Sequence, residues 1–163
     1  MSALGMSTRR PALLFVCTGN ICRSPLAEGT FRAVARRLHL DVEVDSAGTG
    51  RWHVGEPPDP RAIEVARRNG IDIAGQRARV LVAADYERFT DILALDRSHV
   101  REIEARRPAG ATASVSLLLD HVPGRKGQSV ADPYYGNLED FDKAFADVLE
   151  AAAALAAMIG HNG

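Results

Sequence analysis

The run from Pro11 to Val16 is wholly apolar, and it ends in Cys17, after which the sequence does not continue as a strand. An uninterrupted apolar run of this length is typical of a strand that is covered on both faces. The Gly-Asn pair at 19–20 tolerates a positive φ and predicts a tight turn. Ser24 and Pro25 then stand at the N-cap and the first position of an expected helix. The stretch therefore predicts a buried parallel strand, a loop and a helix in immediate succession.

Strand and helix signals alternate along the rest of the chain, which implies a parallel sheet with helices on both faces. At 163 residues the chain is long enough for one domain. We expect an α/β fold: a single three-layer domain over 11–163, with a central four-stranded parallel sheet, after a disordered N-terminal lead-in over 1–10. The other expected strands are 42–45, 90–95 and 115–119. Three more helices are expected. One runs from Asp59-Pro60 to Gly70, one passes through Val100 and Ile103 and ends before Pro108, and the last follows the cap Asn137.

Composition excludes few classes of protein but indicates in which cellular environment the chain is expected. The formal net charge of -1 gives no reason to expect nucleic acid or a membrane surface as a partner. No targeting segment stands out, and two cysteines four residues apart make a poor disulfide framework, so we expect a reducing, cytoplasmic setting. The only lysines are Lys126 and Lys143, an arginine bias that indicates a GC-rich bacterial genome. A monomer is the default expectation.

The loop after the first strand has the features of an anion site. Ligands of parallel α/β sheets bind beyond the carboxyl ends of the strands, and this loop also lies at a helix N-terminus, whose N–H groups and dipole favour an anion. Arg23 adds a bidentate fork that suits phosphate oxygens. The same surroundings favour the thiolate of Cys17, which Ser24 could stabilise by donating its hydroxyl. We therefore expect attack of Cys17 on phosphorus and a phosphocysteine intermediate.

Other interpretations of these residues are open. A lone cysteine after an apolar run is more often a small buried hydrophobe, and a Cys-x5-Arg pattern alone arises by chance. The Walker pattern that ends in Gly-Lys-Ser/Thr is absent, which disfavours nucleotide triphosphate hydrolysis.

Departure of an alcohol or phenol from a phosphate ester is helped by a proton donor. Among several candidate aspartates, Asp132 stands out because it lies in DPYYG, in the polar loop before the last helix, beside Tyr134 and Tyr135. A plain turn with two half-exposed tyrosines is the alternative interpretation of DPYYG. The other candidate acids are Asp45, Asp59, Asp96 and Asp120.

The combination of VCTGNICRSP with a late DPYYG resembles the low-molecular-weight protein tyrosine phosphatase family over nearly the whole chain. SAGTG at 46–50, Trp52 and ALD at 94–96 also match the family. The resemblance implies that Cys17 is the nucleophile, Arg23 the phosphate clamp and Asp132 the general acid, with no metal and no other cofactor. It implies that the backbone N–H groups of residues 18–23 form the phosphate cradle, which includes Thr18, Gly19, Asn20, Ile21 and Cys22.

The resemblance also implies supporting roles. Asn20 would hold a left-handed turn, with Ser46 bonded to its side chain. Trp52, Tyr134 and Tyr135 would wall a slot for a flat phenyl ring. Asp96 would contact substrate or shape the pocket rather than donate the proton. Under oxidation Cys22 would form a reversible disulfide with Cys17. The sequence departs from the family's pattern at Gln76 and His99.

Phosphotyrosine proteins are the expected substrates, and three alternatives compete with them. Arsenate reductases of related fold need further cysteines, and none follows Cys22. Arginine phosphatases form another branch of the same fold, but the apolar Ile21 favours an aromatic ring. A non-catalytic phosphotyrosine-binding module is disfavoured because Cys17, Arg23 and Asp132 are all present. No pair of histidines has the spacing of metal ligands, and we assign none of them a role. We interpret three as solvated surface residues: His53, His99 and His121.

Overall fold

The first apolar run forms a central strand of a parallel sheet. A computed structural model describes residues 9–162 of the chain. The sheet has four strands in the order β2-β1-β3-β4, and all neighbouring pairs are parallel. This confirms the predicted four-stranded parallel sheet. The strands are β1 (Ala12–Cys17), β2 (Glu43–Gly48), β3 (Asp91–Ala94) and β4 (Ser114–Leu117).

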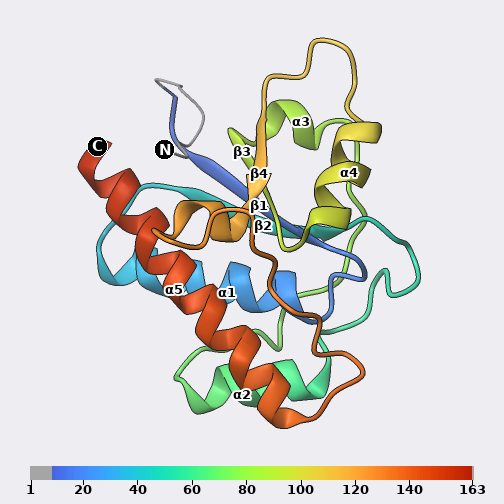
Figure 1. Cartoon of the computed structure of the whole chain (residues 1–163), viewed down its shortest axis with the longest axis vertical. Coiled ribbons are helices and arrows are strands. Elements are labelled where there is room, and N and C mark those ends of the chain that lie inside the picture. Colours follow the sequence, from blue (N-terminus) through green and yellow to red (C-terminus); the bar gives the residue numbers. More distant parts are fainter. Residues whose placement is uncertain (1–8, 163) are drawn as a thin grey trace.

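Helices cover both faces of this sheet, which confirms the predicted three layers (Figure 1). Alternate side chains of β1 enter two different hydrophobic clusters, because successive residues of a strand point to opposite faces. Phe15 and Cys17 pack toward one set of helices, and Leu14 and Val16 pack toward the other. The first set is α1 (Arg23–Arg37), α2 (Pro60–Arg68) and α5 (Leu138–Asn162), with the 3-10 turn η1 (Leu118–His121); the second is α3 (Asp85–Arg88) and α4 (Arg97–Ala105).

Two helix starts lie where the sequence predicts them. Asp59 caps α2, and its carboxylate accepts a 2.8 Å hydrogen bond from the backbone N–H of Arg61. Before α5, the Asn137 side chain accepts from the Asp140 N–H while the Asp140 carboxylate accepts from the Asn137 N–H. Each pair satisfies backbone donors that a helix cannot satisfy internally.

The start of α1 differs from the prediction. The helix begins at Arg23, and its N-cap is Cys22, which makes no side-chain cap hydrogen bond. The hydroxyl of Ser24 therefore does not cap the helix and instead bonds to Cys17 and Asn20. The N-cap residue of α1 therefore supplies no side-chain acceptor for the first backbone N–H groups, which lie next to the loop that follows β1.

Three further boundaries differ. The second strand extends to Gly48 because its last residue continues the ladder with Cys17 and also bridges to Val80. The fourth strand ends at Leu117, since the Asp120 carboxylate accepts from the Leu117 N–H and turns the chain into η1. The helix α3 was not expected, because four residues are too few to show a helical period.

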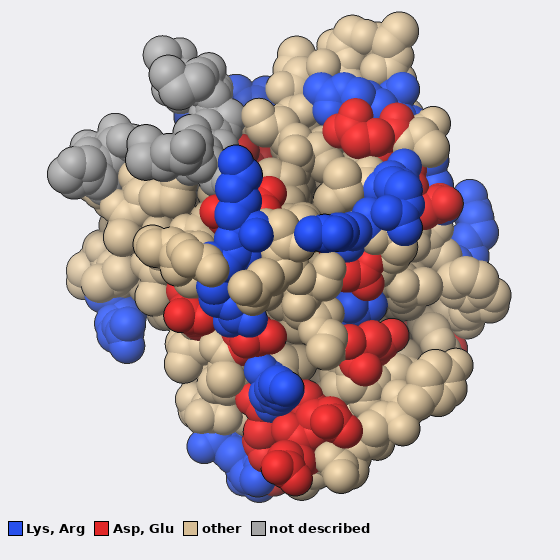
Figure 2. Space-filling model, viewed as in Figure 1, with Lys and Arg blue, Asp and Glu red and all other residues tan. Residues whose placement is uncertain are grey.

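Most of the expected N-terminal lead-in, residues 1–8, lies outside the described residues. The described part is attached to the domain: the Arg9 guanidinium donates to the carbonyls of Glu87 and Arg88, and Arg10 pairs with Asp41 at 2.8 Å. Basic and acidic side chains are interspersed on the face shown in Figure 2. Within residues 9–162, no helix combines the length and the apolarity needed to cross a membrane.

The end of β2 lies directly against the loop that follows β1. The Gly50 N–H donates to the Thr18 carbonyl at 2.9 Å, and the Thr49 N–H donates to the Cys17 carbonyl at 2.9 Å. A Cβ added at Gly48 would lie 2.7 Å from the Thr18 carbonyl oxygen and 3.2 Å from the Asn20 backbone nitrogen. The absence of a side chain at Gly48 is therefore what lets the loop fold back over the strand.

We expect Gly48→Ala to displace this loop and to lower the free energy of unfolding by about 1–3 kcal/mol, the usual cost of overpacking. Gly75→Ala is the matched control, because a Cβ there meets nothing within 4 Å; it should change the free energy by no more than about 1 kcal/mol. Urea unfolding of both variants measures the difference. Equal effects of the two substitutions would contradict the argument from close approach.

Candidate active site

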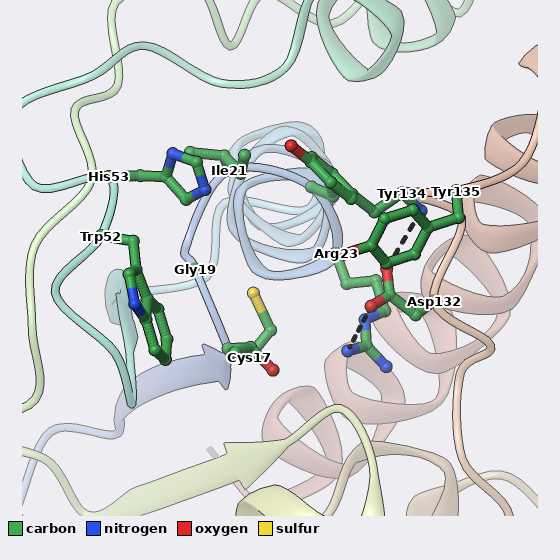
Figure 3. Close-up of a pocket in the computed structure, with 11 residues that line it drawn as sticks. Cys17, Gly19, Ile21, Arg23, Trp52, His53, Asp132, Tyr134 and Tyr135 are labelled. Atoms are coloured by element: carbon green, nitrogen blue, oxygen red, sulfur yellow. Dashed lines mark hydrogen bonds and ion pairs between the residues drawn. The ribbon is translucent and has the colours of Figure 1, made fainter.

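The residues after β1 form the floor of a cavity at the carboxyl edge of the sheet. Cys17 is the last residue of β1, and its sulfur points into the cavity (Figure 3). The cavity has a volume of about 420 Å³. Its lining residues come from the loop and from two later segments of the chain: Cys17, Thr18, Gly19, Ile21, Cys22, Arg23, Trp52, His53, Asp132, Tyr134 and Tyr135.

The loop is held from behind by the side chain of Asn20, whose φ is 58°. Its amide nitrogen donates to the hydroxyls of Ser24 and Ser46 at 2.7 and 3.0 Å, and its amide oxygen accepts from the Arg79 N–H at 3.0 Å. The Ser46 hydroxyl donates in turn to the buried Glu28 carboxylate at 2.6 Å. The left-handed turn and the bond to Ser46 were expected, and the bonds to Arg79 and Glu28 extend the support to two more segments.

The sulfur of Cys17 has a hydroxyl partner. Its Sγ lies 3.0 Å from the Oγ of Ser24. Because Asn20 already donates to that oxygen, the Ser24 hydrogen is free to point at the sulfur. Ser24 can therefore donate to Cys17, which stabilises a thiolate more than a thiol.

Arg23 is 3% exposed and is fixed by acceptors on two segments. One terminal nitrogen, Nη1, donates to the Asp96 carboxylate and to the Val130 carbonyl, both at 2.8 Å. The other, Nη2, lies 3.6 Å from the carboxylate of Asp132 (dashed in Figure 3). The guanidinium is thus held in one orientation at the cavity wall before any ligand enters.

Asp96 is not among the residues that line the cavity. It caps α4 and holds Arg23 from the far side. Burial opposes ionisation of this carboxyl, but the hydrogen bond from Ser98 and the proximity of His99 and Arg23 outweigh it and lower the pKa of Asp96 to about 2. Asp96 is therefore an anion at neutral pH and acts through Arg23.

Asp132 lies beside Arg23 on the cavity wall, on a segment that is tied to α2 (Figure 3). Its side chain is 49% exposed, and its carboxylate accepts from the Tyr134 N–H at 3.1 Å. The Arg61 guanidinium, paired with Asp59, donates to the carbonyls of Tyr134 and Gly136 at 2.9 and 3.0 Å. Arg61 therefore fixes the segment that carries Asp132. No sequence pattern predicts this link, because it joins residues more than seventy positions apart.

Aromatic side chains flank the mouth of the cavity. Trp52 is 74% exposed and stands on one side of Cys17, while Tyr134 and Tyr135 stand on the other (Figure 3). The two tyrosine rings meet edge to face at 4.9 Å. Such a pair of walls offers apolar faces to a flat ring that enters between them.

Several predicted site residues lie outside this lining. Asn20, Ser24 and Ser46 support the loop from behind, and Asp96 supports Arg23. The other predicted residues line the cavity. Among residues 9–162 there is also no group of three or more His, Cys, Asp or Glu side chains placed to hold a metal ion.

The interpretation as surface residues is wrong for His99 and His121, which are buried, whereas His53 is partly exposed. His53 lines the cavity beside Gly19 and lies 3.2 Å from Glu56. His99 is 1% exposed and contacts Thr18, and His121 is buried against Ser116. His53 directly follows Trp52, and His99 stands at a departure from the family's pattern, but neither signal predicted the burial of a histidine.

A family model described as low molecular weight phosphotyrosine protein phosphatase matches residues 12–163. The chain belongs to this family. A relative of that name from Schizosaccharomyces pombe is 40% identical over 146 residues, which cover 88% of this chain and 93% of that protein.

Solved structures of this phosphatase family agree with the fold. A protein tyrosine phosphatase from Entamoeba histolytica is 32% identical, with a TM-score of 0.87 over 93% of this chain and 98% of its own. DARP, a Drosophila arginine phosphatase, is 30% identical, with a TM-score of 0.82 over 88% of this chain and 94% of its own.

The two departures from the family's pattern both contact the loop region. The amide of Gln76 donates to the Pro25 carbonyl at 3.2 Å and so supports the first turn of α1. His99 lies beside the loop and bonds to Thr18.

Cys22 is buried, and burial raises the pKa of its thiol, which therefore remains protonated at neutral pH. Its disulfide with Cys17 stays a prediction, since both cysteines are free.

The buried His99 should make stability depend on pH. Burial lowers the pKa of His99 from 6.5 to about 4, despite the nearby carboxylate of Asp96. Below about pH 6.5 the unfolded chain binds a proton that the folded chain refuses. The free energy of unfolding should therefore decrease as the pH falls from about 6.5 to about 4.

His99→Gln should remove this contribution. The stability difference between the unaltered chain and the variant should be larger at pH 7 than at pH 5, as measured by urea unfolding. The buried His121 contributes equally to both chains and cancels. Parallel pH curves for the two proteins would contradict the burial of a neutral His99.

Proposed function

We propose that the chain hydrolyses phosphotyrosine in proteins through a phosphocysteine intermediate. The observation that carries this proposal is the position of Cys17: its sulfur lies at the floor of the cavity, 3.0 Å from the Ser24 hydroxyl, with Arg23 and Asp132 on the surrounding walls. Membership of a family whose relatives are named phosphotyrosine protein phosphatases supports the same reaction.

In the first step the Cys17 thiolate attacks phosphorus. The bond between phosphorus and the phenolic oxygen breaks, and protonated Asp132 gives its proton to the departing oxygen. Arg23 and the N–H groups at the start of α1 neutralise the charge on the remaining phosphoryl oxygens. The products of this step are a free tyrosine hydroxyl and a phosphorylated Cys17.

In the second step a water molecule attacks the phosphorus of phosphocysteine. Asp132, now a carboxylate, accepts a proton from that water, and the bond between sulfur and phosphorus breaks. Inorganic phosphate leaves, and the Cys17 thiolate is restored with the Ser24 hydroxyl beside it. Asp132 is then protonated and ready for the next cycle.

The walls of the cavity support an aromatic substrate. Trp52 and Tyr134 present ring faces on opposite sides of Cys17, and the apolar Ile21 lies at the loop between them. Burial of a phenyl ring against these side chains contributes affinity that a small polar phosphate ester lacks. The resemblance in fold to an arginine phosphatase keeps phosphoarginine as the second candidate substrate.

We place this activity in the cytoplasm of a bacterium, in a monomer that acts on proteins rather than on nucleic acid or a membrane. The net charge of -1 and the interspersed surface charges support such a partner. The reactive Cys17 and the neighbouring Cys22, both free thiols, support a reducing compartment.

Trapping the intermediate tests the reaction. Rapid acid quench with a phosphotyrosine peptide, followed by mass spectrometry, should find phosphate on Cys17, and Cys17→Ser should lose turnover. A phosphoarginine peptide is run in parallel. Faster turnover of phosphoarginine would transfer the proposal to that substrate, and the absence of a phosphorylated Cys17 would refute the mechanism.

Asp132→Ala tests the proton donor. It should slow hydrolysis of phenyl phosphate by roughly 10² to 10⁴, because a poor leaving group needs the proton. The loss should be much smaller for p-nitrophenyl phosphate, whose leaving group departs without help. Asp96→Asn is the matched control: it disturbs Arg23 and should slow both esters by a similar factor. A leaving-group effect in Asp96→Asn instead would show that Asp132 is not the acid.

A further inference from the structure

The hydroxyl of Thr18 has one hydrogen-bond partner among residues 9–162. Its Oγ1 lies 2.8 Å from the Nε2 of His99. Thr18 also lines the cavity and is an exposed residue, whereas His99 is almost completely buried. A buried ring therefore reaches the phosphate loop from α4, on the side of the sheet opposite to α1.

The surroundings of His99 determine which ring nitrogen carries the proton. The backbone N–H of Asp96 points at Nδ1, 3.2 Å away, and a backbone amide can only donate. Nδ1 must therefore accept. The Asp96 Oδ1, 3.5 Å from Nδ1, already accepts from the N–H and hydroxyl of Ser98 and from the His99 N–H. Burial keeps the ring neutral, so the single proton is on Nε2.

This assignment sets the direction of the bond to Thr18. The Nε2–H of His99 donates to Oγ1, so the hydroxyl hydrogen cannot point back at the ring. No protein acceptor for that hydrogen is present within residues 9–162. The hydrogen therefore remains available to an acceptor outside the protein, and Thr18 is an exposed residue that lines the cavity.

We propose that the Thr18 side chain donates its hydroxyl hydrogen to an oxygen of the phosphate group in the cavity, and that His99 is the positioning residue that orients this donor. The donor adds to the backbone N–H groups of the loop and to Arg23. The inference rests on the proposed function only in that the cavity receives a phosphate monoester or phosphate itself. It makes residue 18 a determinant of phosphate affinity through its side chain.

Binding of inorganic phosphate to the intact chain, measured by isothermal titration calorimetry, tests the proposal without turnover. Thr18→Val keeps the shape of the side chain and removes the hydroxyl, so it should weaken phosphate binding about tenfold or more, the worth of a hydrogen bond to a charged group. Thr18→Ser keeps the hydroxyl and should stay within about threefold of the unaltered chain. Equal phosphate affinity of Thr18→Val and the unaltered chain overturns the proposal.

The role of His99 is tested by coupling. His99→Phe should weaken phosphate binding about fivefold in the unaltered background but less than about twofold in the Thr18→Val background, because its effect passes through the hydroxyl. His99→Gln, which retains a donor for Thr18, should lose less than His99→Phe. Additive losses would show a merely structural role. If His99→Phe does not fold, His99→Leu, which also lacks a donor for Thr18, provides the same comparison alone and combined with Thr18→Val.

The outcomes separate this inference from the proposed function. Failure of the unaltered chain to bind phosphate overturns the donor role. Phosphate binding that depends on the Thr18 hydroxyl, in a chain that does not turn over phosphotyrosine, supports the donor role and rejects the proposed substrate.

Discussion

Asn20 has a φ of 58°, and three hydrogen bonds from its side chain hold it in that conformation. A left-handed conformation costs a non-glycine residue on the order of 1 kcal/mol, so the surrounding structure must compensate for it. Ser24, Ser46 and the Arg79 backbone supply that compensation from three segments. The shape of the loop around Cys17, and with it the position of Ser24 beside the sulfur, depends on this arrangement.

The positive charge of Arg23 is paired with Asp96 in a way that leaves part of the guanidinium free for a ligand. Asp96 lies behind Arg23, and the two form a short ion pair in a largely buried environment. Removing the carboxylate would leave a buried guanidinium with fewer partners, which is costly. Because Asp96 binds Nη1 and Asp132 is 3.6 Å from Nη2, Arg23 keeps donors for an incoming anion. Arg23 is therefore oriented before binding, and little entropy is lost when the anion arrives.

Local patterns made part of this structure predictable. The apolar run before Cys17, the caps Asp59 and Asn137 and the alternation of strands and helices each follow from neighbouring residues, and they determine the fold. The positions of Cys17, Arg23 and Asp132 around one cavity could be anticipated from two separate motifs, through the family resemblance that joins them. Ser24 was misassigned only as the N-cap: its hydroxyl bonds across the loop to Cys17, the contact that was anticipated for the thiolate. The burial of His99 depends on how α4 packs, and no local pattern contains that information.

The turn at Asp59–Arg61, where α2 begins, contacts both the loop after β1 and the segment that carries Asp132. The Asp59 N–H binds the Ile21 carbonyl of the nucleophile loop at 2.8 Å, and Arg61 binds the carbonyls of Tyr134 and Gly136. Together with the bond from Arg23 to the Val130 carbonyl, the first turn of α2 therefore helps to set the position of Asp132 relative to Cys17. A substitution at this turn would therefore disturb the loop and the Asp132 segment together, although the two lie far apart in the sequence.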